Sequence, residues 1–305
     1  MSGCIKSVIN VVKHNSLKEY EILYVDSKST DDSLNVVRKF QNVKIIRLLG
    51  DYNAAIARNV GAFESKGDIL FFIDGDMEIN PFFLRLVYSD SGGLKFNFVS
   101  GQFIDIEYNN GKVKKEKKYH QINGKLKKQY TTGGLFIIRR EVWEYVGGMR
   151  NKLRRNQDID LGIRLANKGF LLVRINEILA YHHTVSYRNP KRMFRLIFNG
   201  DDLFRCVLLR DNLLNKYQWL YFLRENYTMF MLLLLFIFTV FTGKYYFLFA
   251  YILALIIRVL RKKGESLINR VLIYIYYVIR DVAVFIGLFF FWPSEPKNIK
   301  FEKNR

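Results

Sequence analysis

The stretch Phe71-Phe72-Ile73-Asp74-Gly75-Asp76 decides how this chain folds and what it can bind. Its apolar part is short and continuous, which is typical of a strand buried in an α/β sheet. Asp74 and Asp76 follow at its end. Because side chains two residues apart on a strand point to the same face, the two carboxylates can converge on one divalent cation. Carboxylate oxygens suit Mg²⁺ or Mn²⁺, which commonly bridge protein and phosphate groups. A solvated surface turn is the alternative for this pattern taken alone.

Further strands and helices alternate around this stretch. The apolar runs are 21–26, 43–48 and 68–73, and the helical patterns between them are 29–40 and 53–65. This alternation predicts an α/β domain with a mostly parallel, Rossmann-like sheet. Ligands of such sheets bind beyond the carboxyl ends of the strands. Since Asp26, Asp74 and Asp76 occupy such ends, we expect them to line one site.

The charge of the chain predicts an anionic partner. Its 305 residues include 48 Lys and Arg against 28 Asp and Glu, a net charge of +20. Nucleotides, acidic membrane surfaces and nucleic acids all fit such an excess. No nucleic-acid-binding motif accompanies the charge, and many basic residues flank apolar segments, so we expect no nucleic-acid partner.

Residues 101–130 form a second kind of segment. Gln102 to Tyr108 alternates between apolar and polar residues, and Asn109-Asn110-Gly111 predicts a hairpin turn. The following stretch from Lys112 to Lys128 is strongly basic. It is either a solvated hairpin or a surface that contacts anionic lipid or a phosphorylated acceptor.

The chain changes character after about residue 190. Residues 191–228 carry apolar positions at helical spacing among Arg and Lys, which predicts amphipathic helices at a membrane interface or against the first domain. Residues 229–305 contain three apolar stretches, at 229–242, 245–257 and 272–292. The first two are each shorter than the ~30 Å hydrocarbon core, so they form one tilted span or a helical hairpin. Basic residues at 258–270 favour the cytoplasmic side of the membrane. If the first domain is also cytoplasmic, the chain must cross an even number of times, which favours the hairpin.

Several motifs together resemble the family 2 glycosyltransferases, which are inverting enzymes with a GT-A fold. Val25-Asp26-Ser27-Lys28-Ser29-Thr30-Asp31 resembles the family's nucleotide loop, and Ala57-Arg58-Asn59-Val60-Gly61 precedes the Asp74-Gly75-Asp76 motif as it does there. Thr132-Gly133-Gly134 resembles its glycine loop, and Gln157-Asp158-Ile159-Asp160-Leu161 its [EQ]-D-x-[DE]-[LF] motif. His182-His183 stands where many GT-A enzymes carry a late histidine. The resemblance covers residues 1–190, the expected catalytic domain.

The resemblance implies a role for each matched residue. Asp26, Arg58, Asp74, Gly133 and Gly134 are expected to bind the donor. Asp74 and Asp76 are expected to hold Mg²⁺ or Mn²⁺, with His182 or His183 completing the metal shell or touching phosphate. Asp158 is expected to be the general base that deprotonates the acceptor hydroxyl. Structural alternatives are an ion pair for Arg58, a helix cap for Asp158 and a packing role for the histidines.

Two features depart from the family pattern. The family opens with a strand and a nucleotide-contacting loop, whereas residues 4–9 here already resemble the helix that follows them. The first strand is therefore expected to be missing, because the chain is a fragment or because the fold lacks a central strand. Ser27 also replaces a second acidic residue, which leaves Asp26 as the main candidate for base recognition.

The sequence supports two functional hypotheses. The first is a hexosyltransferase-like enzyme at the cell membrane, with its catalytic domain on the cytoplasmic side. It would transfer sugar from a nucleotide sugar, UDP being the family's commonest nucleotide, to a lipid-linked or polysaccharide acceptor in cell-surface glycan assembly. The second is a degenerate membrane protein that binds nucleotide, sugar or a partner without turnover. The missing strand favours the second hypothesis, and the intact acidic motifs favour the first.

Overall fold

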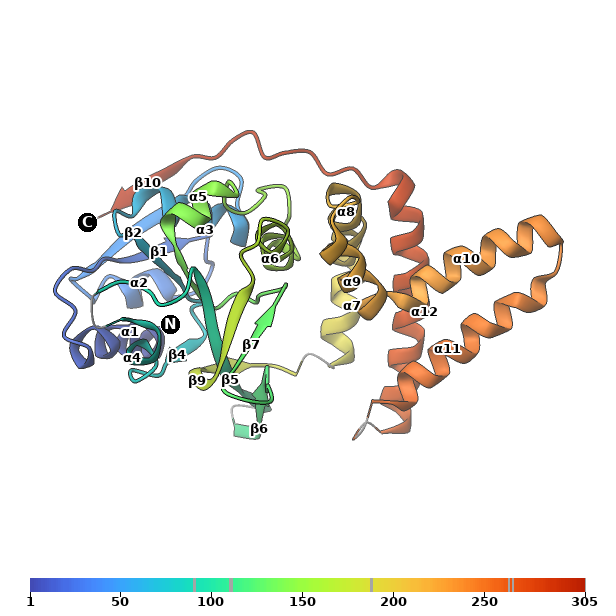
Figure 1. The fold of residues 1–305 in the computed structure, drawn as a ribbon, viewed down its shortest axis with the longest axis horizontal. Helices are drawn as coiled ribbons and strands as arrows, with labels where there is room; N and C mark the ends of the chain where they lie inside the picture. Colours follow the sequence, from blue (N-terminus) through green and yellow to red (C-terminus); the bar gives the residue numbers. More distant parts are fainter. Residues whose placement is uncertain (90–91, 110–111, 187–188, 263, 265, 305) are drawn as a thin grey trace. The chain divides into compact units, whose positions relative to one another are not determined.

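The computed structural model describes the chain except residues 90–91, 110–111, 187–188, 263, 265 and 305 (Figure 1). Two compact units are present. Unit 1 comprises residues 1–185 and 294–305, and unit 2 comprises residues 186–293. The sequence places residues 294–305 in the membrane-associated segment, whereas in the structure they rejoin unit 1.

Two sheets form the framework of unit 1. The smaller sheet has the order β1 (Ile22–Asp26), β2 (Val43–Leu48) and β10 (Phe301–Asn304). The larger sheet has the order β3 (Ile69–Phe72), β8 (Phe136–Arg139), β5 (Phe98–Asn109), β9 (Leu172–Thr184) and β4 (Met77–Ile79). Two further strands extend it, β6 (Lys112–Tyr119) on β5 and β7 (Leu126–Gln129) on β9.

The α/β class is confirmed, but the prediction of a mostly parallel sheet is wrong. Among the strand pairs of the described residues, β1–β2 and β5–β9 are parallel and the others are antiparallel. β5 and β6 are joined by a short connection, which allows only an antiparallel pair. β10 comes from the far end of the chain and also pairs antiparallel with β2. Residues 110–111 of the predicted hairpin turn lie outside the described residues.

Strands β1 and β3 are edge strands of their sheets. The described residues that precede β1 form helix α1 (Ser2–His14) and a short loop, in line with the expectation that this chain shows no strand there. β1 is buried only at Asp26, whereas four of the six residues of β2 are buried. Both sheets therefore keep an open edge next to an acidic motif.

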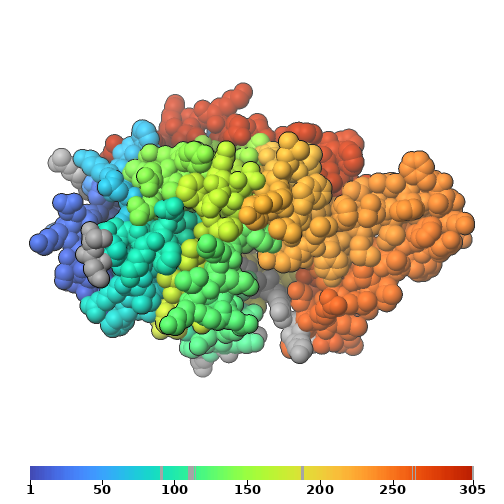
Figure 2. All heavy atoms as spheres, in the orientation of Figure 1, coloured from blue at the N-terminus to red at the C-terminus, as the bar shows by residue number. Residues whose placement is uncertain are grey.

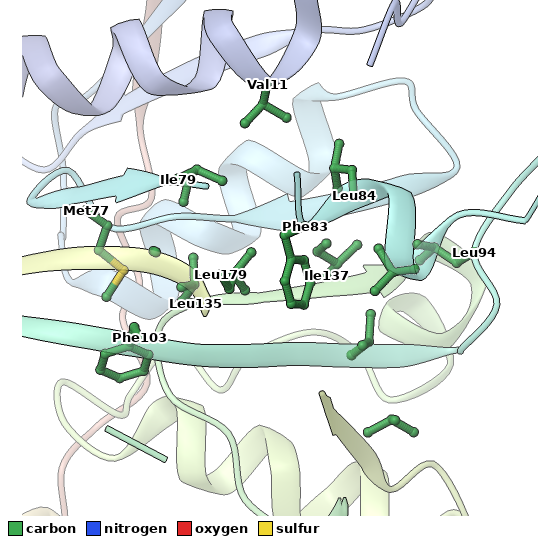
Figure 3. Packing of buried hydrophobic residues seen from close by; sticks show 14 residues of the cluster. Val11, Met77, Ile79, Phe83, Leu84, Leu94, Phe103, Leu135, Ile137 and Leu179 are labelled. Carbon is green, nitrogen blue, oxygen red and sulfur yellow. The ribbon is translucent and has the colours of Figure 1, made fainter. Parts of the chain in front are cut away.

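Helices α1 and α3 (Ala54–Glu64) hold the two sheets together. Ile5 of α1 packs with Val43 and Ile45 of the smaller sheet, and Val11 of the same helix packs with Met77 in the core cluster of the larger sheet (Figure 3). In α3, Ile56 and Val60 pack on β2, while Ala55 and Ala62 pack with Leu70 and Phe136. Each helix thus contributes to the core of both sheets.

The remaining helices of unit 1 are short. They are α2 (Ser33–Val37), α4 (Leu84–Val87), α5 (Arg140–Tyr145) and α6 (Gln157–Asn167). Asn53 caps α3 by accepting a hydrogen bond from the Ile56 amide at 2.9 Å, as the predicted helix at 53–65 requires. The predicted helix at 29–40 begins later, because residues before Ser33 form a loop. There the Ser29 amide donates to Asp26.

Unit 2 is helical. Its elements are α7 (Pro190–Phe198), α8 (Phe204–Asp211), α9 (Lys216–Glu225), α10 (Tyr227–Thr242), α11 (Leu248–Leu260) and α12 (Leu267–Phe290), with one-turn helices at 201–203 and 245–247. Within the described part of the chain, α12 alone is long and apolar enough to cross a membrane as one straight helix. α9 and α10 meet such a criterion together but are bent by 90°. α12 runs without a break through Arg280 and Asp281.

Candidate functional site

The two carboxylates of the opening motif lie in a tight turn. β3 ends at Phe72, and the Met77 amide donates to the Asp74 carbonyl at 3.1 Å as β4 begins. The expectation that a strand aims both side chains at one point is therefore wrong. Arg58 Nη2 donates to Asp74 Oδ1 at 2.5 Å, whereas Asp76 Oδ2 lies 3.3 Å from His182 Nε2. Each carboxylate has its own cationic partner.

Four of the predicted residues form one group: Arg58, Asp74, Gly134 and Asp158. Gly134 is so close to the Asp74 carboxylate and to Arg58 Nη2 that a Cβ atom at position 134 would collide with both. The charges of Arg58 and Asp74 both act on the Asp158 carboxyl. Arg58 Nη1 is buried and has no hydrogen-bond partner in the structure. A buried guanidinium nitrogen without a partner is suited to an anionic ligand.

Local packing explains why these residues meet. Asn59, next to Arg58 on α3, donates to the Met149 carbonyl at 2.6 Å and to Asn151 Oδ1 at 2.7 Å. These bonds tie α3 to the loop that precedes α6. Gly162 on α6 leaves no room for a side chain against the backbone of Thr131 and Thr132, so α6 packs directly on the glycine loop. Asp158 at the start of α6 is thereby brought within reach of the charges of Arg58 and Asp74.

The environment of Asp158 changes its acidity. Loss of water around the carboxyl raises the pKa of Asp158 above its usual value, and the Asp74 charge acts in the same direction. The Arg58 charge and the hydrogen bond from the Ile159 amide oppose this shift. A carboxylate with a raised pKa is a stronger proton acceptor, which is what a general base needs.

A second group joins Asp76, His182 and Asp105. Asp105, on β5, is almost fully buried and lies 2.8 Å from His182 Nδ1, while His182 Nε2 faces Asp76. Burial by itself lowers the pKa of His182, but the hydrogen bonds to Asp105 and Asp76 raise it to about 9. Loss of water tends to raise the pKa of Asp76, and the hydrogen bond and charge of His182 outweigh that effect and lower it.

The other predicted residues have partners outside these two groups. His183 follows His182 on β9, and its amide donates to the Asp76 carbonyl at 2.9 Å, but its side chain has other partners. Tyr108 Oη lies 2.8 Å from its Nδ1 and Glu78 Oε1 3.3 Å from its Nε2. Asp26 is buried at the end of β1, where it accepts hydrogen bonds from Tyr24 of the same strand and from the Ser29 amide of the following loop. Gly133 has room for a Cβ atom, with His120 Nε2 at 3.9 Å as the nearest contact.

The side chains of Asp76 and His182 suit a divalent cation whose coordination shell a bound ligand completes. Among the residues described by the structure, no group of three or more His, Cys, Asp or Glu side chains is placed to hold a metal. Mg²⁺ typically needs only one or two carboxylates when substrate phosphates complete its shell. Asp76 and His182 Nε2 are two suitable donors, and Asp105 fixes the orientation of the imidazole from behind, as partners of metal-binding histidines do.

Sequence reasoning missed Asp105 and Asn59 as parts of the site. The signal for Asp105 is a carboxylate in an alternating strand, at a position that shares its face with the buried Phe103. The signal for Asn59 is its place directly after Arg58. Asp160, in the same motif as Asp158, is fully buried between Arg150 at 2.8 Å and Arg164 at 2.7 Å. It therefore holds the start of α6 in place.

The raised pKa of His182 predicts how stability depends on pH. Folding raises this pKa from an ordinary 6.5 to about 9. The contribution of protonated His182 to stability is therefore complete below pH 6.5 and lost as the pH rises through about 9. We expect Asp105→Asn to lower the His182 pKa in metal-free protein, followed by NMR of the imidazole. An unchanged titration in the variant would contradict the assigned pair.

Several known proteins are similar to this chain in sequence. Residues 2–150 match the family model described as glycosyl transferase family 2. The chain is 28% identical to the glycosyltransferase AglE of Haloferax volcanii over 174 residues, which cover 54% of this chain and 57% of AglE. It is 26% identical to a cholesterol galactosyltransferase of Borreliella burgdorferi over 106 residues, 34% of this chain and 28% of that protein.

A shorter sequence match and one solved structure complete the comparisons. The chain is 33% identical to a poly(ribitol-phosphate) beta-glucosyltransferase of Bacillus spizizenii over 81 residues, 25% of this chain and 12% of that protein. A crystal structure of GalNAc-T7 with UDP, GalNAc and Mn²⁺ aligns with a TM-score of 0.49 and 16% identity, covering 60% of this chain and 40% of that one. The chain spans little more than half of AglE and smaller shares of the others. Through residues 2–150, the chain belongs to glycosyl transferase family 2 and carries an α/β domain of the GT-A type.

Proposed function

We propose that this protein is an inverting glycosyltransferase that moves a sugar from a nucleotide sugar, with UDP as the nucleotide, to a lipid-linked or polysaccharide acceptor at the cell membrane. One observation carries the proposal. Arg58, Asp74, Gly134 and Asp158 form one group at the carboxyl end of β3, and Asp76 with its partner His182 follows in the same turn of the chain. This arrangement supplies a phosphate-binding cation, a metal-binding pair and a base within one site.

The donor diphosphate is the group that Arg58 suits best. Its Nη2 is engaged with Asp74, and its buried Nη1 is left to donate to an anionic oxygen. Asp74 orients the guanidinium, and Gly134 removes the side chain that would otherwise obstruct both groups. Asp26 and Gly133 complete the proposed donor-binding residues, on the basis of the family motifs.

Asp76 and His182 would hold Mg²⁺ or Mn²⁺ in this proposal, and His183 stands outside that pair. A bound metal would neutralise the negative charge that builds up on the leaving diphosphate. His182 must give up its Nε2 proton before it can bind a metal, so binding there releases a proton. Asp105 keeps the imidazole directed at Asp76 in either state.

Asp158 would act as the general base. Its raised pKa lets the carboxylate accept the proton of an acceptor hydroxyl, while the Arg58 charge opposes the rise of that pKa. An acceptor oxygen activated there would attack the anomeric carbon on the side opposite the diphosphate. Such an attack inverts the configuration of the sugar.

The acceptor and the location are supported by unit 2 and by the relatives. Two relatives are named as transferases that act on poly(ribitol-phosphate). Unit 2 exposes large apolar side chains along α10, α11 and α12. With a net charge of +20, these features support attachment to an anionic membrane, with unit 1 on the cytoplasmic side.

Nucleotide binding tests the proposal directly. We expect UDP to bind the detergent-purified protein more tightly with Mn²⁺ than without, measured by calorimetry. Asp76→Asn should abolish the Mn²⁺ effect, because it removes the carboxylate beside His182. Glu78→Gln is the matched control, since Glu78 pairs with His183 instead. Folded wild-type protein that binds no nucleotide would favour the non-catalytic alternative.

The base assignment has its own test. Asp158→Asn keeps the size of the side chain but removes its proton affinity, so UDP binding should persist while sugar transfer falls by about 10²–10⁴-fold. Transfer is measured as UDP release that depends on acceptor. Transfer at the wild-type rate would rule out Asp158 as the base.

The two glycines should respond differently. Gly134→Ala places a Cβ atom against Asp74 and Arg58, so we expect weaker UDP binding and a loss of transfer of about 10-fold or more. Gly133→Ala meets only an ordinary contact with His120 and should bind UDP much as the wild type does. Equal losses in both variants would show that the close approach at Gly134 is not what matters.

A further inference from the structure

The α10–α11 hairpin has the composition and the exposed apolar surface of a segment that lies in an apolar solvent. Between Tyr227 and Ile257 the chain has a single charged residue, Lys244, in the turn that joins the two helices. Large apolar side chains near this turn are strongly exposed, among them Phe241 at 84% and Phe249 at 66%. In Figure 2 the side chains of this region, in orange, form a continuous surface. Exposed apolar surface of this extent marks an interaction site.

Polar atoms near the turn are satisfied inside the hairpin. Thr239 Oγ1 donates to the Leu235 carbonyl at 2.8 Å, and Thr242 Oγ1 donates to the Phe238 carbonyl at 2.7 Å. Gly243 adopts a left-handed conformation, and its amide donates to the Thr239 carbonyl at 2.9 Å. A lipid environment, which offers no hydrogen bonds, demands this kind of internal pairing.

The opposite end of the hairpin holds a buried polar network. Arg258 Nη1, in the last turn of α11, donates to Thr228 Oγ1 at 2.6 Å, in the first turn of α10. Thr228 in turn donates to Asp281 Oδ2 at 2.5 Å, and Arg280 Nη2 donates to Asp281 Oδ1 at 2.5 Å. The Arg258 guanidinium also packs 4.2 Å from the centre of the Tyr277 ring.

This network fixes the base of the hairpin to the middle of α12, because Arg280 and Asp281 lie near the centre of that helix. The hairpin and α12 therefore cannot both span one bilayer. If α12 crossed, Arg258, Arg280 and Asp281 would lie near the centre of the hydrocarbon, where ionisable groups are costly. If the hairpin crosses, the same groups lie at the headgroup level.

The connectivity of the chain also favours a crossing by the hairpin over a crossing by α12. The chain enters unit 2 from unit 1 and returns to unit 1, where β10 pairs with β2. A folded sheet stays on one side of a bilayer, so unit 2 crosses an even number of times. A hairpin of α10 and α11 gives two crossings, whereas adding α12 gives an odd number.

We infer that the α10–α11 hairpin is the element of this protein that spans the bilayer, and that α12 lies in the interface on the side of unit 1. α10 has 16 residues, about 24 Å of helix. The side chains of Lys244, Tyr245 and Tyr246 extend its reach to the far headgroups, where Lys and Tyr are favoured. Arg258, Arg261 and Lys262 face the near, anionic headgroups.

The surface of α12 fits an interfacial position. One exposed apolar stripe runs along the helix at spacings of three and four residues, comprising Leu267, Val271, Ile275, Ile279, Val282, Ile286 and Phe290. The other face is buried in the bundle through Ile273, Tyr277 and Val284. A helix with one such stripe can lie in the plane of the membrane with the stripe in the acyl boundary.

Cysteine labelling on sealed membrane vesicles with unit 1 outside tests the inference. The background is the full chain with Cys4→Ala and Cys206→Ala, and the probe is a membrane-impermeant maleimide. Glu141→Cys, on an exposed position of unit 1, marks the outer side. We expect Glu141→Cys to react without detergent and Tyr245→Cys to react only after detergent. Reaction of Tyr245→Cys without detergent would overturn the hairpin crossing.

The two ends of α12 form the matched pair. Leu267→Cys and Phe290→Cys are both strongly exposed and should show the same accessibility as each other before detergent. Labelling of Phe290→Cys with protection of Leu267→Cys would show that α12 crosses and would overturn the inference. A bimane fluorophore attached to Ile279→Cys reports the depth of α12 in the bilayer. Quenching by lipids brominated near the headgroup should exceed quenching by lipids brominated near the chain end, and the reverse order contradicts an interfacial α12.

The inference rests on the membrane attachment proposed above and not on turnover. Labelling and quenching report position in a protein of any activity. An inactive chain with the expected labelling pattern would therefore refute the transferase proposal alone. An active chain whose Tyr245→Cys reacts without detergent would refute this inference alone.

Discussion

The packing of α3 on both sheets is the constraint on which unit 1 depends. One side of this helix buries Ile56 and Val60 against the smaller sheet, and the other buries Ala55 and Ala62 against the larger one. No strand pairing joins the two sheets among the described residues, so helix packing sets their separation. Arg58 and Asn59 lie on the same helix, so the packing that positions α3 in the core also positions these two residues of the site.

Charge pairing then gives each acidic residue of the site a different character. Asp74 is neutralised by Arg58, Asp76 by His182, and Asp160 by Arg150 and Arg164. Among the described residues, Asp158 has no such close ion-pair partner, and loss of water raises its pKa. Carboxylates that lie close together can serve as ligand, orienting group and base when their surroundings differ in this way.

Unit 2 uses buried charge for a different purpose. Arg258, Thr228, Asp281 and Arg280 join three helices through hydrogen bonds of fixed geometry. Apolar packing alone specifies the angle and register of helices weakly, whereas a fully bonded polar network admits few alternatives. In the membrane topology inferred above, the same network places the base of the hairpin at the headgroup level.

The sequence by itself determined the local elements and the family. β1, β2 and β3 lie within one residue of the predicted runs, and Asn53 caps α3 as its residue type suggests. These features depend on contacts between near neighbours, which periodicity and capping patterns record. The ordered motifs around Asp26, Arg58, Asp74 and Asp158 were enough to indicate a family 2 transferase domain.

Only the tertiary structure decided which of these residues meet. It placed Asp105 behind His182, turned His183 away, and separated Asp74 from Asp76 by giving each its own partner. It also divided the strands between two sheets and returned the end of the chain to β2. These outcomes depend on packing between residues far apart in the chain, and a pattern of near neighbours carries no information about such distances.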